Sequence, residues 1–382
     1  MEHHAYPLAL NPLPAHLRLG LIGLATCGLL SLVSTAGAIG FIVYRLSNYK
    51  KYQATPLRYN VPLVLILNLL IADLQQAASF AISLHWLGLN AILAPTHACS
   101  AQGWLIQIGD VASGVFALAV AAQTFYVMVL RRDLSYTAFV WGILAIWAFC
   151  VLLSLISPIL HRNEALFVST GAWCWISESY HDEVLYPHPS RNLPLTPPQK
   201  TEANQKCNYL WQRLFVHYMW IFACEVGTVI LYTTTFLVLR HNIRTNAVAG
   251  VRGGGGCSAS TATATINRVA RLMLVYPIAY TCLTLPLAAY RMLSLAPRHQ
   301  GRRNDTFQLL AGACMASCGW VDVILYFVTR RSIVILHHRH CNYRHRTPRS
   351  GGMGDTEMNP ELAYRNNITT GGCVTMAETV EE

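Results

Sequence analysis

Four side chains that could take part in chemistry lie inside long apolar stretches of this sequence. They are the carboxylates Asp73, Asp110, Glu225 and Asp322. A carboxylate at membrane depth is costly, so each should face other helices and have a polar partner there. Such groups can bind an ion, move protons, hold a ligand or join helices by hydrogen bonds. A membrane-embedded zinc hydrolase would need clustered histidines beside them, and the sequence has no such set. We therefore expect no metal, no cofactor and no enzyme.

The elements that must position these carboxylates are apolar segments. Hydrophobic residues make up 53% of the chain and charged residues only 12%, whereas soluble domains carry about 25% charged residues. Seven stretches are long enough to cross about 30 Å of hydrocarbon as helices. They lie near residues 17–44, 61–87, 103–130, 137–160, 210–239, 272–295 and 307–329. The sequence thus predicts an all-α fold, a bundle of seven transmembrane helices.

The Lys and Arg residues predict the orientation of this bundle. The segments after the odd-numbered stretches contain more than twice as many Lys and Arg residues as the remaining segments between and before the stretches. The positive-inside rule therefore places the segments after the odd-numbered stretches in the cytoplasm. We therefore expect a short extracellular tail at 1–16, a helix bundle at 17–331 and a mostly disordered cytoplasmic tail at 332–382. The net charge of +10 is then loop charge beside membrane lipids, with no nucleic acid as partner.

In this topology three of the twelve cysteines lie outside the cell, where a disulfide can form. Cys99 opens the third stretch and Cys174 lies in the second outer loop. A bridge between them would fold that loop across the helices. Cys207 is a competing partner or an unpaired thiol, but the favoured pair is Cys99 with Cys174.

Several motifs resemble one receptor family in their order and placement. They read LNLLIAD at 67–73, GAWCWIS at 171–177, RLFVHYMWIF at 213–222, YPIAYTCLTLPLA at 276–288 and GWVDVILYFVTRR at 319–331. This set resembles the fungal cyclic-AMP-receptor-like and glucose-sensing G-protein-coupled receptors, over most of 17–331. Two features of rhodopsin-like receptors are missing. The third helix has Gln-Thr-Phe at 123–125 in place of Asp-Arg-Tyr, and no proline follows Asp322.

The resemblance implies a plasma-membrane receptor that senses a small extracellular ligand of the nutrient type. Its partner would be the Gα of a heterotrimeric G protein, and its output the cyclic-AMP and protein kinase A pathway. The alternative is a polytopic transporter or proton-coupled carrier, which also uses intramembrane carboxylates. No inverted repeat or pair of broken helices supports it. A retinal pump needs a lysine within a span, but all four lysines fall in loops.

The resemblance also assigns an activation switch. Asp73 and Asp322 would approach each other as a polar cluster that binds water or an ion and rearranges. Tyr326 belongs to the same switch, and Pro286 gives the sixth span a place to bend because it removes a helical hydrogen bond. The alternative is a fixed hydrogen-bond network that joins helices.

A ligand pocket is expected near the outer ends of the helices, from Asp110, Trp175, His217 and Arg291. Each residue has a simpler interpretation. Asp110 could pair with Ser113 or with a neighbouring helix, Trp175 could belong to an interfacial aromatic belt, and His217 and Arg291 could extend to the membrane surface.

Basic residues at the inner helix ends are the expected G-protein contacts. The alternative is that they only orient the chain and neutralise lipid headgroups. They are Arg131, Arg132, Arg240, Arg244, Arg268, Arg271, Arg330 and Arg331.

Overall fold

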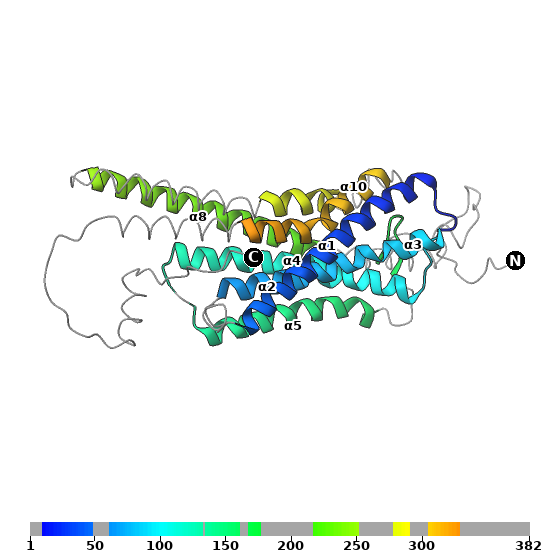
Figure 1. Cartoon of the computed structure of the whole chain (residues 1–382), viewed down its shortest axis with the longest axis horizontal. Coiled ribbons are helices and arrows are strands. Elements are labelled where there is room, and N and C mark those ends of the chain that lie inside the picture. Colours follow the sequence, from blue (N-terminus) through cyan, green and yellow to red (C-terminus); the bar gives the residue numbers. More distant parts are fainter. Residues whose placement is uncertain are drawn as a thin grey trace, which may run out of the picture.

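The computed structural model describes residues 10–48, 61–132, 134–160, 167–176, 217–251, 278–290 and 305–328. Its helices run side by side along the long axis of the molecule, and a small β-hairpin lies at one end (Figure 1). Within these ranges six helices are long and apolar enough to cross a membrane. A shorter apolar helix, Ile278–Tyr290, is the described part of the predicted sixth span.

The labelled helices follow the predicted order. They are α1 (Ala15–Ser47), α2 (Val61–Ala81) with α3 (Ser83–Leu89) continuing it, α4 (His97–Met128), α5 (Tyr136–Leu160), α8 (Met219–Val251) and α10 (Asp305–Ala316). The third span starts earlier than the predicted residue 103 because Thr96 caps α4, its side-chain oxygen accepting from the Cys99 backbone nitrogen at 3.2 Å. The predicted start of the fifth span at 210 lies outside the described residues, and α8 continues past 239 to Val251.

The closest approach of α2 and α4 depends on a glycine. A Cβ atom at Gly109 would lie 2.7 Å from the backbone nitrogen of Gln76, so any side chain there would push the helices apart. The small residue lets polar side chains on the two helices reach each other directly, as is usual where membrane helices associate.

The seventh span is interrupted without a proline. Ser31 of α1 donates its hydroxyl hydrogen to the Ala316 carbonyl, and the backbone nitrogen of Ser317 turns back to the Cys314 carbonyl at 3.0 Å. The chain returns to helix after Ser317 and continues to Val328. A side chain from a neighbouring helix therefore marks the break that a proline marks elsewhere.

Among the described residues, the hairpin is an element that the all-α prediction did not include. Strand β1 (Phe167–Ser169) pairs antiparallel with β2 (Cys174–Ile176), so that Ser169 lies opposite Cys174. The turn between them contains Gly171 at φ 99°, a backbone conformation that glycine adopts without strain. Strands of three residues are too short to show the alternation by which strands are predicted.

Candidate functional site

The hairpin is fixed to α4 by the predicted disulfide. Cys99 and Cys174 are bonded, and both residues are fully buried. This confirms the favoured pairing, while Cys207 lies outside the described residues. A bridge at this position places the two tryptophans of the GAWCWIS motif beneath the hairpin, against the helices.

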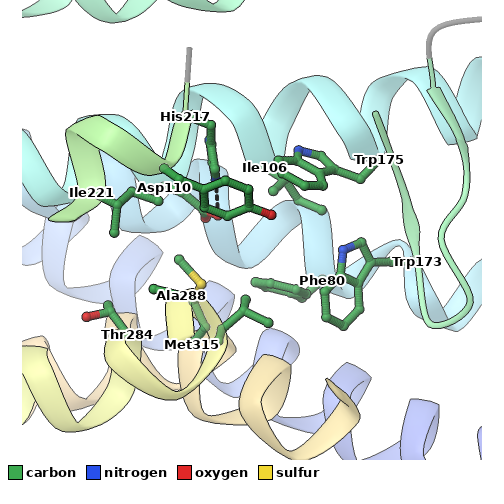
Figure 2. Close-up of a pocket in the computed structure, with 12 residues that line it drawn as sticks. Phe80, Ile106, Asp110, Trp173, Trp175, His217, Ile221, Thr284, Ala288 and Met315 are labelled. Atoms are coloured by element: carbon green, nitrogen blue, oxygen red, sulfur yellow. Dashed lines mark ion pairs between the residues drawn. The ribbon is translucent and has the colours of Figure 1, made fainter. Parts of the chain in front are cut away.

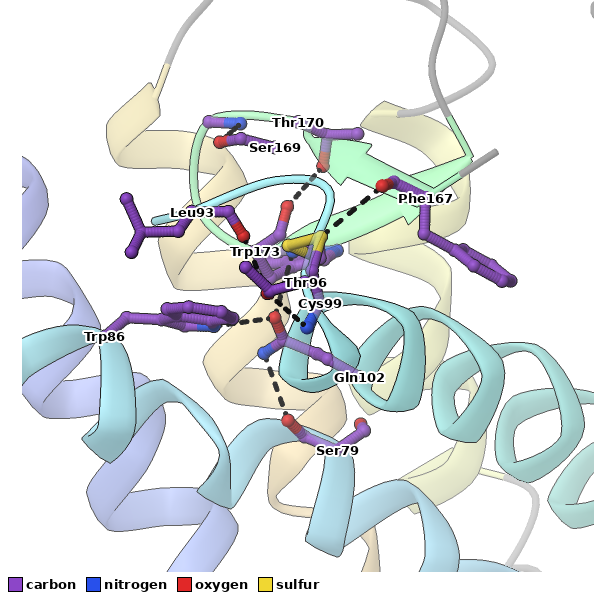
Figure 3. Close-up of a disulfide and its surroundings, with 12 residues drawn as sticks. Ser79, Trp86, Leu93, Thr96, Cys99, Gln102, Phe167, Ser169, Thr170 and Trp173 are labelled. Atoms are coloured by element: carbon purple, nitrogen blue, oxygen red, sulfur yellow. Dashed lines mark hydrogen bonds between the residues drawn. A yellow bond between two sulfur atoms is a disulfide. The ribbon is translucent and has the colours of Figure 1, made fainter. Parts of the chain in front are cut away.

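A buried glutamine holds the same region without a covalent bond (Figure 3). The Gln102 side-chain oxygen accepts hydrogen bonds from the Cys174 backbone nitrogen and from the Trp86 indole nitrogen, both at 2.9 Å. Its amide nitrogen donates to the Ser79 carbonyl at 3.1 Å. One side chain thus joins α2, α3, α4 and β2. The turn of the hairpin is bound to α10 as well, because Gln308 donates to the Thr170 carbonyl at 3.3 Å.

A pocket lies below the hairpin, between the helices (Figure 2). The space between its lining atoms is about 380 Å³, open solvent included. Its walls are aromatic and aliphatic, and Trp173 meets Phe80 edge-on at 5.8 Å between ring centroids. The lining side chains are Phe80, Ile106, Asp110, Trp173, Trp175, His217, Tyr218, Ile221, Thr284, Leu287, Ala288 and Met315.

The polar floor of this pocket consists of Asp110 and His217, which line it, together with Gln76, which is hydrogen-bonded to Asp110 without lining the pocket. Gln76 donates its amide hydrogen to one carboxylate oxygen of Asp110 at 2.8 Å, and the Nε2 atom of His217 lies 3.6 Å from the other. The side chains of His217 and Asp110 are 4% and 2% exposed. Trp175 packs edge-on against the imidazole at 5.0 Å. A ligand can therefore interact with the buried Asp110 carboxylate indirectly, through the His217 side chain that faces it.

The structure brings together three of the four predicted pocket residues. Asp110 lines the pocket and pairs with Gln76 of α2 and not with Ser113, while its contact with a ligand stays a prediction. For His217 the interpretation of a side chain reaching the membrane surface is wrong, because the tryptophan and the carboxylate enclose it. Trp175 is buried rather than in an interfacial belt. Arg291 lies outside the described residues.

Two of the four predicted switch residues, Asp73 and Asp322, form a second polar group together with Ser113, here called the polar layer. Ser113 donates its hydroxyl hydrogen to Asp73 at 2.7 Å, and the carboxyl of Asp322 interacts with that of Asp73. Tyr326 is buried one turn further on, in a small apolar cluster of α1 and α2 side chains. Pro286 lies apart from the polar layer, beside the pocket-lining Leu287.

Glu225, which has no predicted role of its own, also has a partner. The hydroxyl of Thr284, which lines the pocket, hydrogen-bonds to the Glu225 carboxyl and contacts the Tyr280 carbonyl at 2.8 Å. This bond joins α8 to the helix Ile278–Tyr290 beside the pocket. The contact gives a polar reason for the close packing of the fifth and sixth spans.

Of the predicted G-protein contacts, three have described side chains. Arg131 and Arg132 are exposed just past α4, and Arg240 is exposed on α8. The end of α4 lies at the opposite end of the bundle from the hairpin (Figure 1). The backbone of Arg244 belongs to α8, but Arg268, Arg271, Arg330 and Arg331 lie outside the described residues.

Sequence reasoning missed four residues that organise the site: Gln76, Gln102, Trp173 and Thr284. Gln76 and Gln102 carry the clearest signal, since an amide within an apolar helix needs a partner on another helix. Their partners, however, depend on how the helices are rotated against each other.

Comparison with known proteins supports the same reading of the chain. Residues 260–334 match a family described as the C-terminal part of a G protein-coupled glucose receptor regulating Gpa2. No protein with a curated description matches. Squid rhodopsin, known from a crystal structure, is similar in fold with a TM-score of 0.56. The match covers 96% of this chain and 95% of the rhodopsin chain, at 14% sequence identity.

These findings favour a receptor over a transporter. The rhodopsin likeness gives the fold of a seven-helix membrane protein, which agrees with the six long apolar helices and the shorter one at Ile278–Tyr290. The family match covers the sixth and seventh spans and the segment before them, the part of the fold where the receptor motifs at 276–288 and 319–331 lie. The chain is a multi-span protein with the fold of squid rhodopsin, and its residues 260–334 are similar to the C-terminal part of the G protein-coupled glucose receptors that regulate Gpa2.

Proposed function

We propose that this receptor binds a small extracellular ligand in the pocket below the hairpin and passes the signal to a Gα of the Gpa2 type. One observation carries the proposal. The pocket floor and the polar layer use the same two helices, with Asp73 three residues before Gln76 on α2 and Ser113 three residues after Asp110 on α4. Three residues span about 4.5 Å of helix, so the two groups are neighbours.

A ligand in this pocket would touch several helices that can move against each other. Asp110 belongs to α4, His217 precedes α8, and Thr284 belongs to the helix Ile278–Tyr290. A ligand that favours one arrangement of these helices shifts the equilibrium by its difference in affinity for the two arrangements. In the proposal the hydrogen bond from Ser113 to Asp73 and the Asp73–Asp322 contact exchange partners in this shift, with Tyr326 and Pro286 moving along with them.

The proposed orientation places the hairpin outside and the arginine end in the cytoplasm. A disulfide persists in an oxidising compartment, which suits the hairpin end, and basic residues favour the cytoplasmic side. The plasma membrane is the proposed location. Residues 1–16 would be the outer tail and 332–382 the cytoplasmic tail. The cyclic-AMP and protein kinase A pathway is the proposed output, and a nutrient-type ligand stays a prediction.

Orientation can be tested with short tags on intact cells. Tags at residue 2 and within 193–200 should be cleaved by added protease, whereas a tag at residue 382 should be protected. Cleavage of the C-terminal tag would mean that one span has been miscounted.

Coupling can be tested without a ligand, by the basal nucleotide exchange of a purified Gpa2-type Gα in the presence of the receptor. The wild-type receptor should speed exchange. The double variant Arg131→Ala, Arg132→Ala should lower this basal rate severalfold, because the exposed arginines engage the G protein. Arg18→Ala is the matched control, since Arg18 is exposed at the hairpin end of α1.

No exchange with the wild-type receptor would contradict the coupling proposal itself. Equal rates for the double variant and the control would instead show that these arginines only orient the chain and contact lipid headgroups.

A further inference from the structure

We propose that Ser31 of α1 is a positioning residue for signal transfer. Its hydroxyl takes the place of one backbone hydrogen bond of the seventh span and thereby holds that span in its interrupted form. When the hydroxyl leaves, the first half of the span, 305–316, and the second half, 318–328, join as one continuous helix and Asp322 moves. The inference rests on the proposed function only in treating the polar layer as the switch.

The hydroxyl of Ser31 lies between two backbone groups that bond to each other in a continuous helix. In an α-helix the N–H of residue 320 pairs with the carbonyl of residue 316. Here the Ser31 hydroxyl donates its hydrogen to the Ala316 carbonyl, and its oxygen accepts from the Trp320 backbone nitrogen at 3.4 Å. A hydroxyl has one hydrogen and two lone pairs, so it can serve both groups at once. Helices bend sharply where a side chain enters the backbone hydrogen bonds in this way.

The continuous form would keep the same buried groups bonded. The Trp320 N–H would bond directly to the Ala316 carbonyl. The Ser31 hydroxyl would turn to the Cys27 carbonyl, four residues earlier in α1, a common bond for serine and threonine in helices. Thr35 already makes a bond of this type, donating to the Ser31 carbonyl at 2.7 Å. Because both forms satisfy these groups, a ligand or G protein with different affinities for the two forms can exchange them.

The close approach of α1 to the seventh span keeps the hydroxyl within reach. Helices α1 and α10 lie side by side (Figure 1). A Cβ atom at Gly319 would lie 2.8 Å from the Cγ2 atom of Thr35 and 3.1 Å from the Cβ atom of Ser31. Both side chains of α1 are fully buried at this contact. The glycine thus lets a side chain as short as serine reach the backbone of the neighbouring span.

The interruption lies between the pocket and the polar layer. The first half of the span is packed against the hairpin, since a Cβ atom at Gly312 would lie 2.7 Å from the Cζ3 atom of Trp173, and Met315 lines the pocket. The second half carries Asp322, which interacts with Asp73. A change at the interruption therefore moves Asp322 relative to the pocket walls. Among the described residues, α1 contributes to neither the pocket nor the polar layer, so Ser31 acts through the seventh span.

The test measures distances in the purified full-length receptor by pulsed electron paramagnetic resonance. The spin labels are carried by non-natural amino acids, so the native cysteines are kept. One pair of labels, at Val127 and Val328, joins the ends of α4 and the seventh span that lie away from the hairpin. The other pair, at Leu84 and Leu310, joins α3 and the seventh span at the hairpin end. All four side chains are exposed.

The variant Ser31→Ala should change the first distance and leave the second unchanged. The second half of the span, 318–328, is about 15 Å long, so a change of direction of about 20° moves its end by roughly 5 Å. Thr35→Val is the matched control. It removes a buried hydroxyl from the same contact, but that hydroxyl bonds only within α1, so both distances should stay as in the wild type.

The substitution Trp320→Pro provides a rescue, because proline has no backbone N–H and cannot form the direct bond to Ala316. Residue 320 lies in the first turn of the second half, where a helix tolerates proline. The double variant Ser31→Ala, Trp320→Pro should therefore return the Val127–Val328 distance to its wild-type value. Ser31→Ala, Trp320→Ala keeps the N–H and should stay shifted. A residue needed only for packing would not show this difference.

If Ser31→Ala fails to fold, the single variants of Trp320 decide: Trp320→Pro should keep the wild-type distance, as Trp320→Ala does. The proposal is overturned by an unchanged distance in Ser31→Ala, by an equal shift in Thr35→Val, or by a shift in Trp320→Pro that Trp320→Ala lacks.

Basal nucleotide exchange by a Gpa2-type Gα is the second readout. Ser31→Ala should change this rate severalfold, and adding Trp320→Pro should restore it. A shifted distance with an unchanged rate would overturn the part of Ser31 in signal transfer. No exchange with the wild-type receptor would instead contradict the coupling proposal, while the distances, measured without a G protein, still decide whether Ser31 holds the interruption.

Discussion

The hairpin end and the polar layer are both held by polar bonds between helices, but in different ways. At the hairpin end a disulfide, the bond from Cys174 to Gln102 and the bond from Gln308 all hold the ten hairpin residues. Gln102 also bonds to α2 and α3. The polar layer has no covalent link, and each side chain there has one or two contacts. The hairpin end is thus a frame that fixes the pocket walls, while in the proposed mechanism the polar layer exchanges partners.

The difference also appears in the helices themselves. Helix α4 starts under the hairpin with a side-chain cap and is directly bonded to β2. The seventh span, by contrast, is interrupted at Ser317, before it reaches Asp322. At this interruption the Ala316 carbonyl accepts a hydrogen bond from the Ser31 hydroxyl. A broken helix beside a polar pair can change its bend without losing an uninterrupted ladder of backbone bonds. In the proposed mechanism, the fixed hairpin region and the mobile polar layer are therefore successive levels of one bundle.

Breaking the disulfide should have the largest effect on this comparison. Cys99→Ala and Cys174→Ala should each lower the stability of the folded receptor by about 2–4 kcal/mol, since the bridge restricts the unfolded chain. The melting temperature and the amount at the cell surface would both report the loss. The double variant should be no worse than either single one; additive losses would mean that the two cysteines act separately.

Removing the hydrogen bonds of Gln102 should have the next largest effect. Gln102→Leu leaves the Trp86 indole and the Cys174 backbone nitrogen without their acceptor, which should cost about 1–3 kcal/mol. Gln75→Leu is the control, because that side chain bonds only within its own helix, to the Ile71 carbonyl. The melting temperature of the disulfide-intact receptor is the measurement. Equal melting temperatures for the two variants would mean that Gln102 does not stabilise the hairpin end.

Changing the polar layer should affect stability least and signalling most. Asp322→Asn keeps the shape and the hydrogen-bonding capacity of the side chain, so the loss of stability should stay below about 1 kcal/mol. Basal or ligand-driven cyclic-AMP output should nevertheless change at matched surface levels. Asp305→Asn, at the hairpin end of the same span, should leave the output unaltered. Wild-type signalling by Asp322→Asn would favour the fixed-network interpretation.

The sequence predicted the helices well because each is an apolar run of sufficient length, and it predicted the disulfide because topology left few outward cysteines. It could not predict the partners of Asp110, since Gln76 and His217 become neighbours only through the rotation of three helices about their axes. The hairpin was hidden by the shortness of its strands. The amide of Gln102 indicates that it has a partner on another element, but the sequence does not show which one.

The pocket is built from a hairpin and from helices, and this has an evolutionary consequence. Trp173 and Trp175 come from a short hairpin, whereas Gln76 and Asp110 come from the helices that also carry the polar layer. Substitutions in the hairpin can alter which molecule is accepted without disturbing the groups that report its arrival. Descendants of one ancestral receptor could therefore diverge in what they detect by exchanging a few hairpin residues, while inheriting the same response.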